Sequence, residues 1–272
     1  MSDKKKRVPS LIKWTGSKRS QAQIIHALIP KYNRYYEPFL GGGAMLYLNA
    51  RRGTIASDIY APLIELWILV RDKLNMVINH YNDNWNKLQH DLPNHFYHVR
   101  DRYNKTHNPL DLLFLTRTCV NGIIRFNKDG EFNNSFHLSR RGMHPHNFSI
   151  IANKWSDIIK EVEFICTDYS EIFDKAKKGD FIYLDPPYAQ SKNRYIINLD
   201  IKQFFGDLRR LNGKGVKYAL SFDGKRDDID LSYDVPNDIY LRKILINNGH
   251  SAIHKVLNNT KATVGESLYL NY

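Results

Sequence analysis

The sequence feature that most constrains the fold is an apolar run, residues 181–184, which stops at a pair of prolines. Four β-prone residues in a row predict a buried strand, and the prolines end it because neither can donate a hydrogen bond to a neighbouring strand. The end of this strand holds a carboxylate, two rigid carbonyl groups and an aromatic ring, from Asp185, Pro186, Pro187 and Tyr188. Ligands of open α/β sheets bind outside the carboxyl ends of strands, so this position predicts a site.

The groups at this strand end suit the amino edge of a nucleobase. Asp185 can accept a hydrogen bond from an exocyclic amino group, and the carbonyl of Pro186 can accept a second one. Tyr188 can stack on a flat ring, which contributes roughly 1–3 kcal/mol per base. The alternative is a Pro-Pro turn that binds nothing, with Asp185 as a cap.

Chain length and charge predict one large domain, alone or with an insertion, that meets a polyanion. A chain of 272 residues can bury a substantial core. Its formal net charge of +12 is spread along the sequence and favours nucleic acid over membrane, because no amphipathic basic helix stands out. A basic surface with no polyanionic partner is the alternative.

The sequence offers no pattern typical of a membrane protein or of a metal site. No apolar run approaches the ~20 residues that a membrane span needs, and no signal peptide opens the chain. Its two cysteines, Cys119 and Cys166, lie far apart, and its histidines are scattered. We therefore expect a reducing cytoplasm, no membrane partner and no bound metal.

A glycine turn between a strand and a helix predicts a cofactor site near the start of the chain. The strand covers residues 34–39, the glycines are residues 41–43, and a helix is expected to begin near Ala44. Backbone amides can approach a ligand closely in such a turn. The GxGxxG fingerprint is absent, so the turn suits a cofactor without phosphates equally well. A second strand ends at Asp58, where α/β folds hold ribose hydroxyls.

Two further segments carry candidate ligand-binding groups. Trp14 and Lys18 flank a turn and offer an aromatic face and a cation; alternatively they are a core residue and a surface charge. Residues 79–149 are rich in Asn, His, Arg, Lys and aromatics, with a helix at residues 109–118 and a hairpin signal at residues 127–130. This region suits nucleic-acid recognition, and an ordinary polar subdomain is the alternative.

An α/β pattern surrounds this polar region. A helix is expected at residues 62–77 before it. After it we expect strands at residues 162–166, 217–221, 239–246 and 267–271, and helices at residues 171–177 and 199–211.

The order of these motifs resembles that of the Dam-like (D12 class, alpha group) DNA adenine-N6 methyltransferases. Residues 13–18 (KWTGSK) resemble the N-terminal motif of that family, residues 37–43 (EPFLGGG) its cofactor motif, and residues 185–188 its catalytic motif. Residues 109–133 are similar to a stretch of the family's recognition domain. The resemblance covers nearly the whole chain.

The resemblance implies a fold and a domain division. The fold is α/β: a Rossmann-like S-adenosylmethionine-dependent methyltransferase fold with an inserted, mostly helical target-recognition domain that contains a β-hairpin. Residues 1–78 and 151–272 would form the catalytic domain, and residues 79–150 the DNA-binding insertion.

The resemblance also implies an activity and the residues that carry it. S-adenosylmethionine would donate a methyl group to the N6 amino group of an adenine flipped out of duplex DNA, at Asp185 to Tyr188. The matching cofactor-site positions are Trp14, Lys18, Glu37, Phe39, Gly41, Gly43, Asp58, Asp168 and Asp185. Arg125 is the first candidate for a DNA contact, followed by Asn121, Asn133 and Arg140.

The implied partner is double-stranded DNA. We expect a monomer in the cytoplasm, encoded by a bacterium, an archaeon or a phage. In a restriction-modification system, the restriction endonuclease would act independently of it. Residues 134–137 depart from the Pro-Phe-Gly pattern that is frequent in the family, so the target sequence is not read and GATC is not assumed.

Three alternatives remain at the level of the sequence. Methylation of an RNA adenine would use the same catalytic tetrapeptide, but the inserted region matches DNA readers. Methylation of protein glutamine generally shows Asn where this chain has Asp185. The third alternative is a DNA-binding module with an inactive methyltransferase fold. The presence of Asp185, Tyr188 and the glycine turn argues against it, because an inactive protein would not need them.

Overall fold

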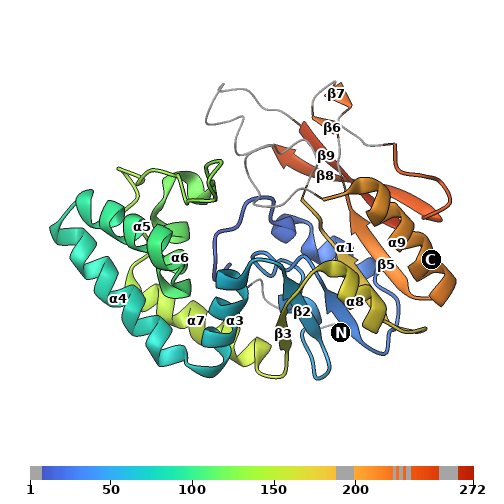
Figure 1. Ribbon diagram of the computed structural model, residues 1–272, viewed down its shortest axis with the longest axis horizontal. Helices are drawn as coiled ribbons and strands as arrows, with labels where there is room; N and C mark the ends of the chain where they lie inside the picture. The colour runs from blue at the N-terminus through green and yellow to red at the C-terminus, as the bar shows by residue number, and fades with distance from the viewer. Residues whose placement is uncertain (1–7, 188–198, 223–224, 227–228, 231–233, 251–262) are drawn as a thin grey trace.

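The computed structural model describes residues 8–187, 199–222, 225–226, 229–230, 234–250 and 263–272 (Figure 1). A mostly parallel sheet lies beside a group of helices, which Figure 1 shows on the left. Tyr188, one of the proposed catalytic residues, lies outside the described residues. Among the described helices, none combines the length and the apolar character needed to span a membrane.

The strands of the sheet follow the order β3-β2-β1-β4-β5-β9-β8. Strands β1 to β5 are parallel to one another, whereas β9 is antiparallel to both β5 and β8. This arrangement confirms the predicted Rossmann-like α/β fold. The bounds are β1 (Tyr35–Glu37), β2 (Ile55–Asp58), β3 (Glu163–Cys166), β4 (Phe181–Leu184), β5 (Lys217–Ser221), β8 (Arg242–His250) and β9 (Thr263–Leu270), with the short β6 (Lys225–Arg226) and β7 (Ile229–Asp230) paired beyond β9.

Both faces of the sheet are covered, which is why its strands read as continuous apolar runs. Phe181 and Tyr183 point to one face and Ile182 and Leu184 to the other, and all four are buried. The first face packs on α1 (Ala22–Leu28), α2 (Leu46–Asn49), α3 (Ala61–Asp72) and α7 (Pro145–Ile159); the second packs on α8 (Tyr169–Lys175) and α9 (Ile201–Lys214).

The helical group lies within the connection from β2 to β3. It contains α4 (Leu74–His90), α5 (Asn94–Thr106) and α6 (Pro109–Thr118). Helix α6 matches its predicted bounds and is buried on nearly all sides. The apolar core runs without a break from this group into the first face of the sheet, so the insertion and the sheet share one core.

Two predictions about helices were wrong. The helix expected at residues 62–77 is two helices that meet at Lys73, whose backbone is not helical. Helix α3 packs on β2 and β3 as well as on α6 and α7, whereas α4 packs on α5, α6 and α7, so the chain turns from the sheet toward the other helices of the group at Lys73. Helix α5 was not predicted, although Phe96, Val99 and Tyr103 mark its buried stripe at helical spacing.

The helix expected near Ala44 begins at Leu46 and lasts about one turn. Strands β8 and β9 start three residues later and four residues earlier than expected, respectively. The division of the chain into domains at residues 78 and 150 stays a prediction. Both positions fall inside helices, α4 and α7.

The expected hairpin forms as a turn held by single bridges. Phe126 bridges to Phe132, and Cys119 bridges to Phe136. The side-chain oxygen of Asn127 accepts hydrogen bonds from the amides of Asp129 (3.0 Å) and Glu131 (2.9 Å). Asn therefore closes this turn with its own side chain, as expected for an Asx turn.

Candidate active site

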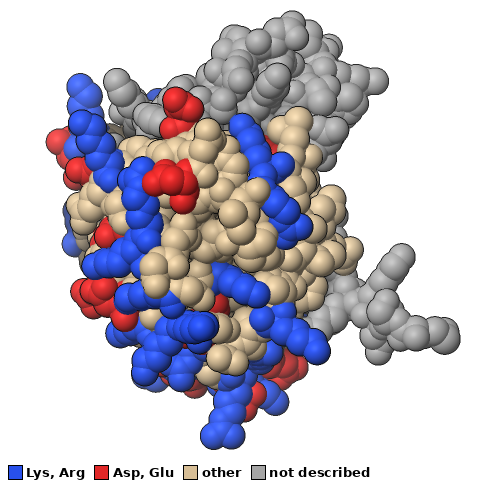
Figure 2. Space-filling model, turned by 90° about the vertical axis from the view of Figure 1, so that its right-hand side faces the viewer, with Lys and Arg blue, Asp and Glu red and all other residues tan. Residues whose placement is uncertain are grey.

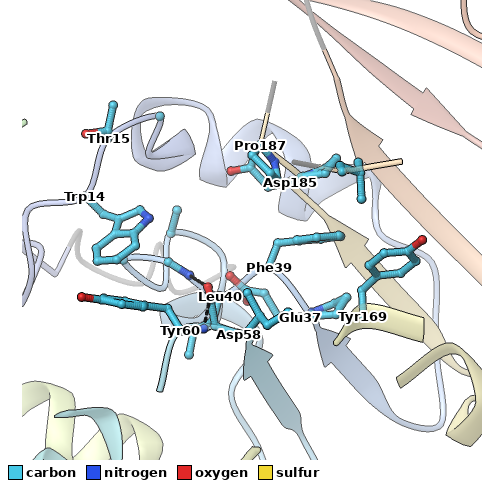
Figure 3. A pocket seen from close by; sticks show the side chains of 18 of the residues that line it. Trp14, Thr15, Glu37, Phe39, Leu40, Asp58, Tyr60, Tyr169, Asp185 and Pro187 are labelled. Carbon is cyan, nitrogen blue, oxygen red and sulfur yellow. Dashed lines mark hydrogen bonds between the residues drawn. The ribbon is translucent and has the colours of Figure 1, made fainter. Parts of the chain in front are cut away.

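A cavity of about 370 Å³ opens at the carboxyl edge of the parallel strands (Figure 3). Glu37 ends β1, Asp58 ends β2, and Asp185 follows β4, because neighbouring parallel strands end at the same edge. In Figure 3, Trp14 and Tyr60 form one wall, and Phe39 and Tyr169 form another. The predicted residues that line the cavity are Trp14, Lys18, Glu37, Phe39, Gly41, Asp58, Asp168, Asp185, Pro186 and Pro187.

The glycine turn brings its backbone against Trp14. Gly41 has φ of +46°, and a Cβ added there would lie 2.7 Å from Cδ1 of Trp14. The indole of Trp67 donates a hydrogen bond to the carbonyl of Gly41 (3.2 Å). Gly43 is different, since it packs against Trp67 and Trp155 and is not among the residues that line the cavity. Its φ of +63° and this close packing are sufficient reasons for a glycine at position 43, without a contact to a ligand.

Asp58 and Asp168 both hold backbone amides at the cavity wall. The carboxylate of Asp58 accepts hydrogen bonds from the amides of Gly41 (3.0 Å) and Tyr60 (3.1 Å), so it fixes the glycine turn to β2. Burial raises its pKa, although these amides act against the shift. Oδ1 of Asp168 caps α8 by accepting from the amide (2.9 Å) and hydroxyl (2.6 Å) of Ser170.

A buried lysine joins segments from the two ends of the chain at the carboxylate of Asp185. Nζ of Lys18 lies 2.7 Å from Oδ1 of Asp185 and 2.9 Å from Oε1 of Glu266, and it donates to the carbonyl of Gly16 (2.9 Å). The lysine side chain is only 4% exposed. Glu266 lies on β9 and accepts a short hydrogen bond from Gln21. One ammonium group therefore compensates two carboxylates in a largely dry site.

Two carboxyl groups of the cavity have raised pKa values. Burial raises the pKa of Asp185 to about 6; Lys18 opposes this shift and Glu266 adds to it. Burial raises the pKa of Glu37 to about 8, against a hydrogen bond from the hydroxyl of Tyr35 (3.0 Å). At neutral pH, Asp185 is therefore mostly ionised and Glu37 is mostly protonated.

The insertion contributes to the cavity, which sequence reasoning missed. Ile124 and Phe126 line it, and the intervening Arg125 is exposed. The ring of Phe126 lies 5.6 Å from that of Tyr60, whose hydroxyl is hydrogen-bonded to Tyr103 on α5. The alternation of apolar and charged residues from 124 to 126 was the available signal. Glu266 was not predicted as a site residue either, although it faces Lys18 from β9.

The proposed DNA-contacting residues lie outside the cavity on the insertion. Asn121, Arg125, Asn133 and Arg140 are all exposed, and none of them lines the cavity. The amide of Asn133 donates to the carbonyl of Arg125 (2.7 Å), so these two lie on facing sides of the turn. Asn121 has φ of +56°, which makes it one of the two non-glycine residues with positive φ in the described part of the chain.

Comparisons with known proteins agree with this geometry. The family model of the D12 class N6 adenine-specific DNA methyltransferases matches residues 14–256. The chain is 30% identical over 248 residues to a Type II methyltransferase, M.MjaIII, of Methanocaldococcus jannaschii, covering 79% of this chain and 84% of that protein.

Other relatives match over shorter regions. A DNA adenine methylase of Vibrio cholerae is 28% identical, with 68% of this chain and 66% of that protein covered. A DNA N-6-adenine-methyltransferase of Escherichia phage P1 is also 28% identical, with 68% of this chain and 24% of that protein covered. Among solved structures, an rRNA methyltransferase of Streptomyces viridochromogenes matches with a TM-score of 0.35 and 12% identity, covering 92% of this chain and 81% of that one.

Proposed function

The chain belongs to the D12 class of N6 adenine-specific DNA methyltransferases, and from this premise we propose how its cavity performs the reaction. The cavity binds S-adenosylmethionine together with an adenine flipped out of duplex DNA, and Asp185 with the carbonyl of Pro186 holds the target amino group. The observation that carries this proposal is the position of Asp185, which is partly buried, paired with Lys18 and open to the cavity.

The charge of the cavity suits this cofactor. Among the described residues that line it, five are acidic, of which Glu37 is mostly protonated at neutral pH, and one, Lys18, is a cation. S-adenosylmethionine carries a sulfonium and an ammonium group against one carboxylate, so a mainly anionic cavity favours it. The absence of a side chain at Gly41 lets the ring of Trp14 pack against the glycine turn at the cavity wall, and Phe39 supplies an apolar wall. In this proposal, Asp58 also accepts from ribose hydroxyls and Asp168 from the cofactor's adenine amino group.

The bound cofactor supplies an electrophilic methyl group, and the chain supplies the position of the nucleophile. Lys18 holds Oδ1 of Asp185, and Oδ2 has no hydrogen-bond partner among the described residues. Oδ2 can therefore accept from one amino proton of the adenine, while the carbonyl of Pro186 accepts from the other. These bonds localise the nitrogen lone pair, which is otherwise conjugated into the ring.

Catalysis then depends mainly on positioning and on stabilising the charge that develops on N6. Asp185 need not be a strong base, because a methylated ammonium-like nitrogen loses its proton readily. Since N6 is inaccessible to a pocket while the base is stacked in a duplex, the adenine must be extruded, which costs a few kcal/mol. Stacking on Tyr188 offsets part of this cost.

We further propose that a monomer binds duplex DNA in the cytoplasm through the exposed turn that carries Arg125, with support from Asn121, Asn133 and Arg140. Their exposure and their position beside the cavity-lining Ile124 and Phe126 support this assignment. Any restriction endonuclease of the same system would act independently.

The test is methyl transfer from radiolabelled S-adenosylmethionine. We expect label in unmethylated genomic DNA, as N6-methyladenine, and none in RNA. The Asp185→Ala variant should lose transfer but keep cofactor binding in calorimetry. Label in RNA alone, no label in any DNA, or full activity of Asp185→Ala would contradict the proposal.

A further inference from the structure

The amino edge of the parallel sheet is strongly basic. Four loops lead into β1, β2, β4 and β5 at residues 30–34, 50–54, 176–180 and 213–217, and each loop carries two Lys or Arg residues. We call this set the amino-edge cations: Lys31, Arg34, Arg51, Arg52, Lys177, Lys178, Lys214 and Lys217. All except the half-buried Lys214 are exposed. Figure 2 shows Lys and Arg gathered on the side of the molecule away from the inserted helices.

The four loops form one continuous surface. The amide of Asn33 donates to the carbonyl of Gly179 (2.9 Å), and Nη2 of Arg51 donates to the carbonyls of Tyr32 (2.8 Å) and Asn33 (3.1 Å). The amide of Lys217 donates to the carbonyl of Asp180 (3.1 Å). The guanidinium of Arg51 also lies over the ring of Tyr32 at 4.0 Å, so its position is fixed.

Little negative charge compensates this surface. The acidic residue within the four loops is Asp180, which is buried and accepts hydrogen bonds from the amides of Arg34 (3.2 Å) and Lys177 (3.0 Å). Asp174, at the margin, is paired with Arg210 at 3.3 Å. Glu161 and Glu163 lie on the flank at β3. The amino-edge cations therefore present a positive field to solvent.

The amino-edge cations lie at the edge of the sheet opposite the one at which the target duplex is proposed to bind. The cavity opens at the carboxyl edge, and a strand of four residues separates the two edges by roughly 10–15 Å. A duplex whose adenine enters the cavity extends away from the carboxyl edge, so its phosphates do not reach the amino edge.

We propose that the amino-edge cations bind a second segment of duplex DNA by its phosphates, so that one molecule holds two DNA segments at once. This inference rests on the proposed seating of the target duplex at the carboxyl edge. An acidic protein fits less well, because the large exposed apolar side chains of the described chain all lie outside these four loops. Protein interfaces generally need such a core, whereas phosphate contacts need only cations.

The test uses the full chain saturated with an unlabelled short cognate duplex and S-adenosylhomocysteine. A labelled duplex without the target sequence is then titrated at low salt. We expect it to bind as a second duplex, and the triple variant Lys31→Gln, Lys177→Gln, Lys178→Gln to weaken it about tenfold or more. Its salt slope should fall by about 2.7 if all three cations contact phosphates. The matched variant Lys73→Gln, Lys87→Gln, Lys154→Gln removes the same charge from exposed positions outside these four loops and should bind like the wild type.

Three outcomes would overturn the proposal. The first is that no second duplex binds, and the second is that both triple variants weaken its binding equally. The third is that the second duplex does not bind, whereas poly-glutamate binds to the wild type and not to the first triple variant. The last outcome would assign the surface to an acidic protein. Methylation of the short duplex alone is measured in parallel, and we expect both triple variants to match the wild type. Loss of methylation in the wild type would instead indicate failure of the proposed function.

Discussion

The strand end at Asp185, proposed to be catalytic, and the turn that carries Arg125, proposed to be the recognition turn, lie beside the same cavity but are held in different ways. Asp185 follows a central strand that is buried on both faces, and a buried ammonium group fixes its carboxylate. Arg125 lies in an exposed turn that is held by isolated bridges and by the side chain of Asn127. The difference indicates that the chemistry needs a fixed carboxylate, whereas target reading uses side chains that meet DNA from solvent.

One contact joins the two regions directly. The hydroxyl of Thr15, in the motif that contains Lys18, accepts a hydrogen bond from the amide of Ile124 (2.9 Å) and lies 3.5 Å from its carbonyl. Lys13 packs against Gly122, and a Cβ added at Gly122 would lie only 2.8 Å from the Cβ of Lys13. The segment that positions the catalytic carboxylate therefore also supports the recognition turn.

Removing the buried cation should have the largest effect. In Lys18→Met, Asp185 and Glu266 face each other without compensation, and such a loss typically costs about 3–5 kcal/mol. We expect this loss in denaturant unfolding at pH 8, together with at least ~100-fold slower single-turnover methylation. Burial already raises the pKa of Asp185 to about 6, and loss of the Lys18 charge raises this pKa further, so Asp185 is protonated at pH 5 and the deficit should be smaller there. Lys73→Met, at an exposed position, is the control, and a similar deficit there would contradict this account.

Arg125→Ala should affect the recognition turn and leave the catalytic strand end intact. We expect kcat/KM on duplex DNA to fall about 10–100-fold, the range for loss of a base or phosphate contact of about 1–3 kcal/mol. Cofactor affinity in calorimetry should not change, because Arg125 does not line the cavity. Lys154→Ala on α7 is the matched loss of an exposed cation. Weaker cofactor binding in Arg125→Ala would show that the two regions are not separable.

Thr15→Val tests the contact between the regions. This substitution removes the hydroxyl that pairs with Ile124 and hardly changes the volume of the side chain. The loss of the hydrogen bond should cost about 1 kcal/mol of stabilisation. We expect discrimination between cognate and near-cognate duplexes to fall about fivefold, while cofactor affinity stays close to that of the wild type. Thr15→Ser keeps the hydroxyl and should restore discrimination. If Ser behaves like Val, the hydrogen bonds to Ile124 are not what matters.

Glu266→Gln should have the smallest effect, a shift in pH dependence. Methylation requires ionised Asp185, so its rate should fall as the pH drops through about 6. Removing the Glu266 charge takes away a repulsion that raises the pKa of Asp185 and leaves Lys18 to pair with Asp185 alone. Both effects lower this pKa, so the acidic limb should move down by less than about one pH unit. Glu163→Gln, on the exposed part of β3, should leave the limb in place; an upward movement in Glu266→Gln would refute the sign.

Local sequence patterns were enough for the elements that carry the chemistry. Strands β4 and β5 and helix α6 have their predicted bounds, because continuous apolar runs end at prolines, at charged residues or at a capping Asn. The spacing of apolar residues in α5 was visible in the sequence, but the packing of this helix and the break at Lys73 depend on which elements the apolar faces pack against in the folded chain. The pairing of Glu266 with Lys18 joins positions 248 residues apart, and no local pattern records it.

The sequence alone determined the proposed reaction centre: a strand that must stop at Asp185-Pro186-Pro187 leaves a carboxylate and a carbonyl at its end, whatever surrounds it. Only the tertiary structure decided the state of that carboxylate, because burial and the distances to Lys18 and Glu266 set its pKa and fix one of its oxygens. It also decided that Ile124 and Phe126 of the insertion close the cavity. Composition gave the amount of positive charge, whereas the parallel order of the strands placed part of it at the amino edge, opposite the active site.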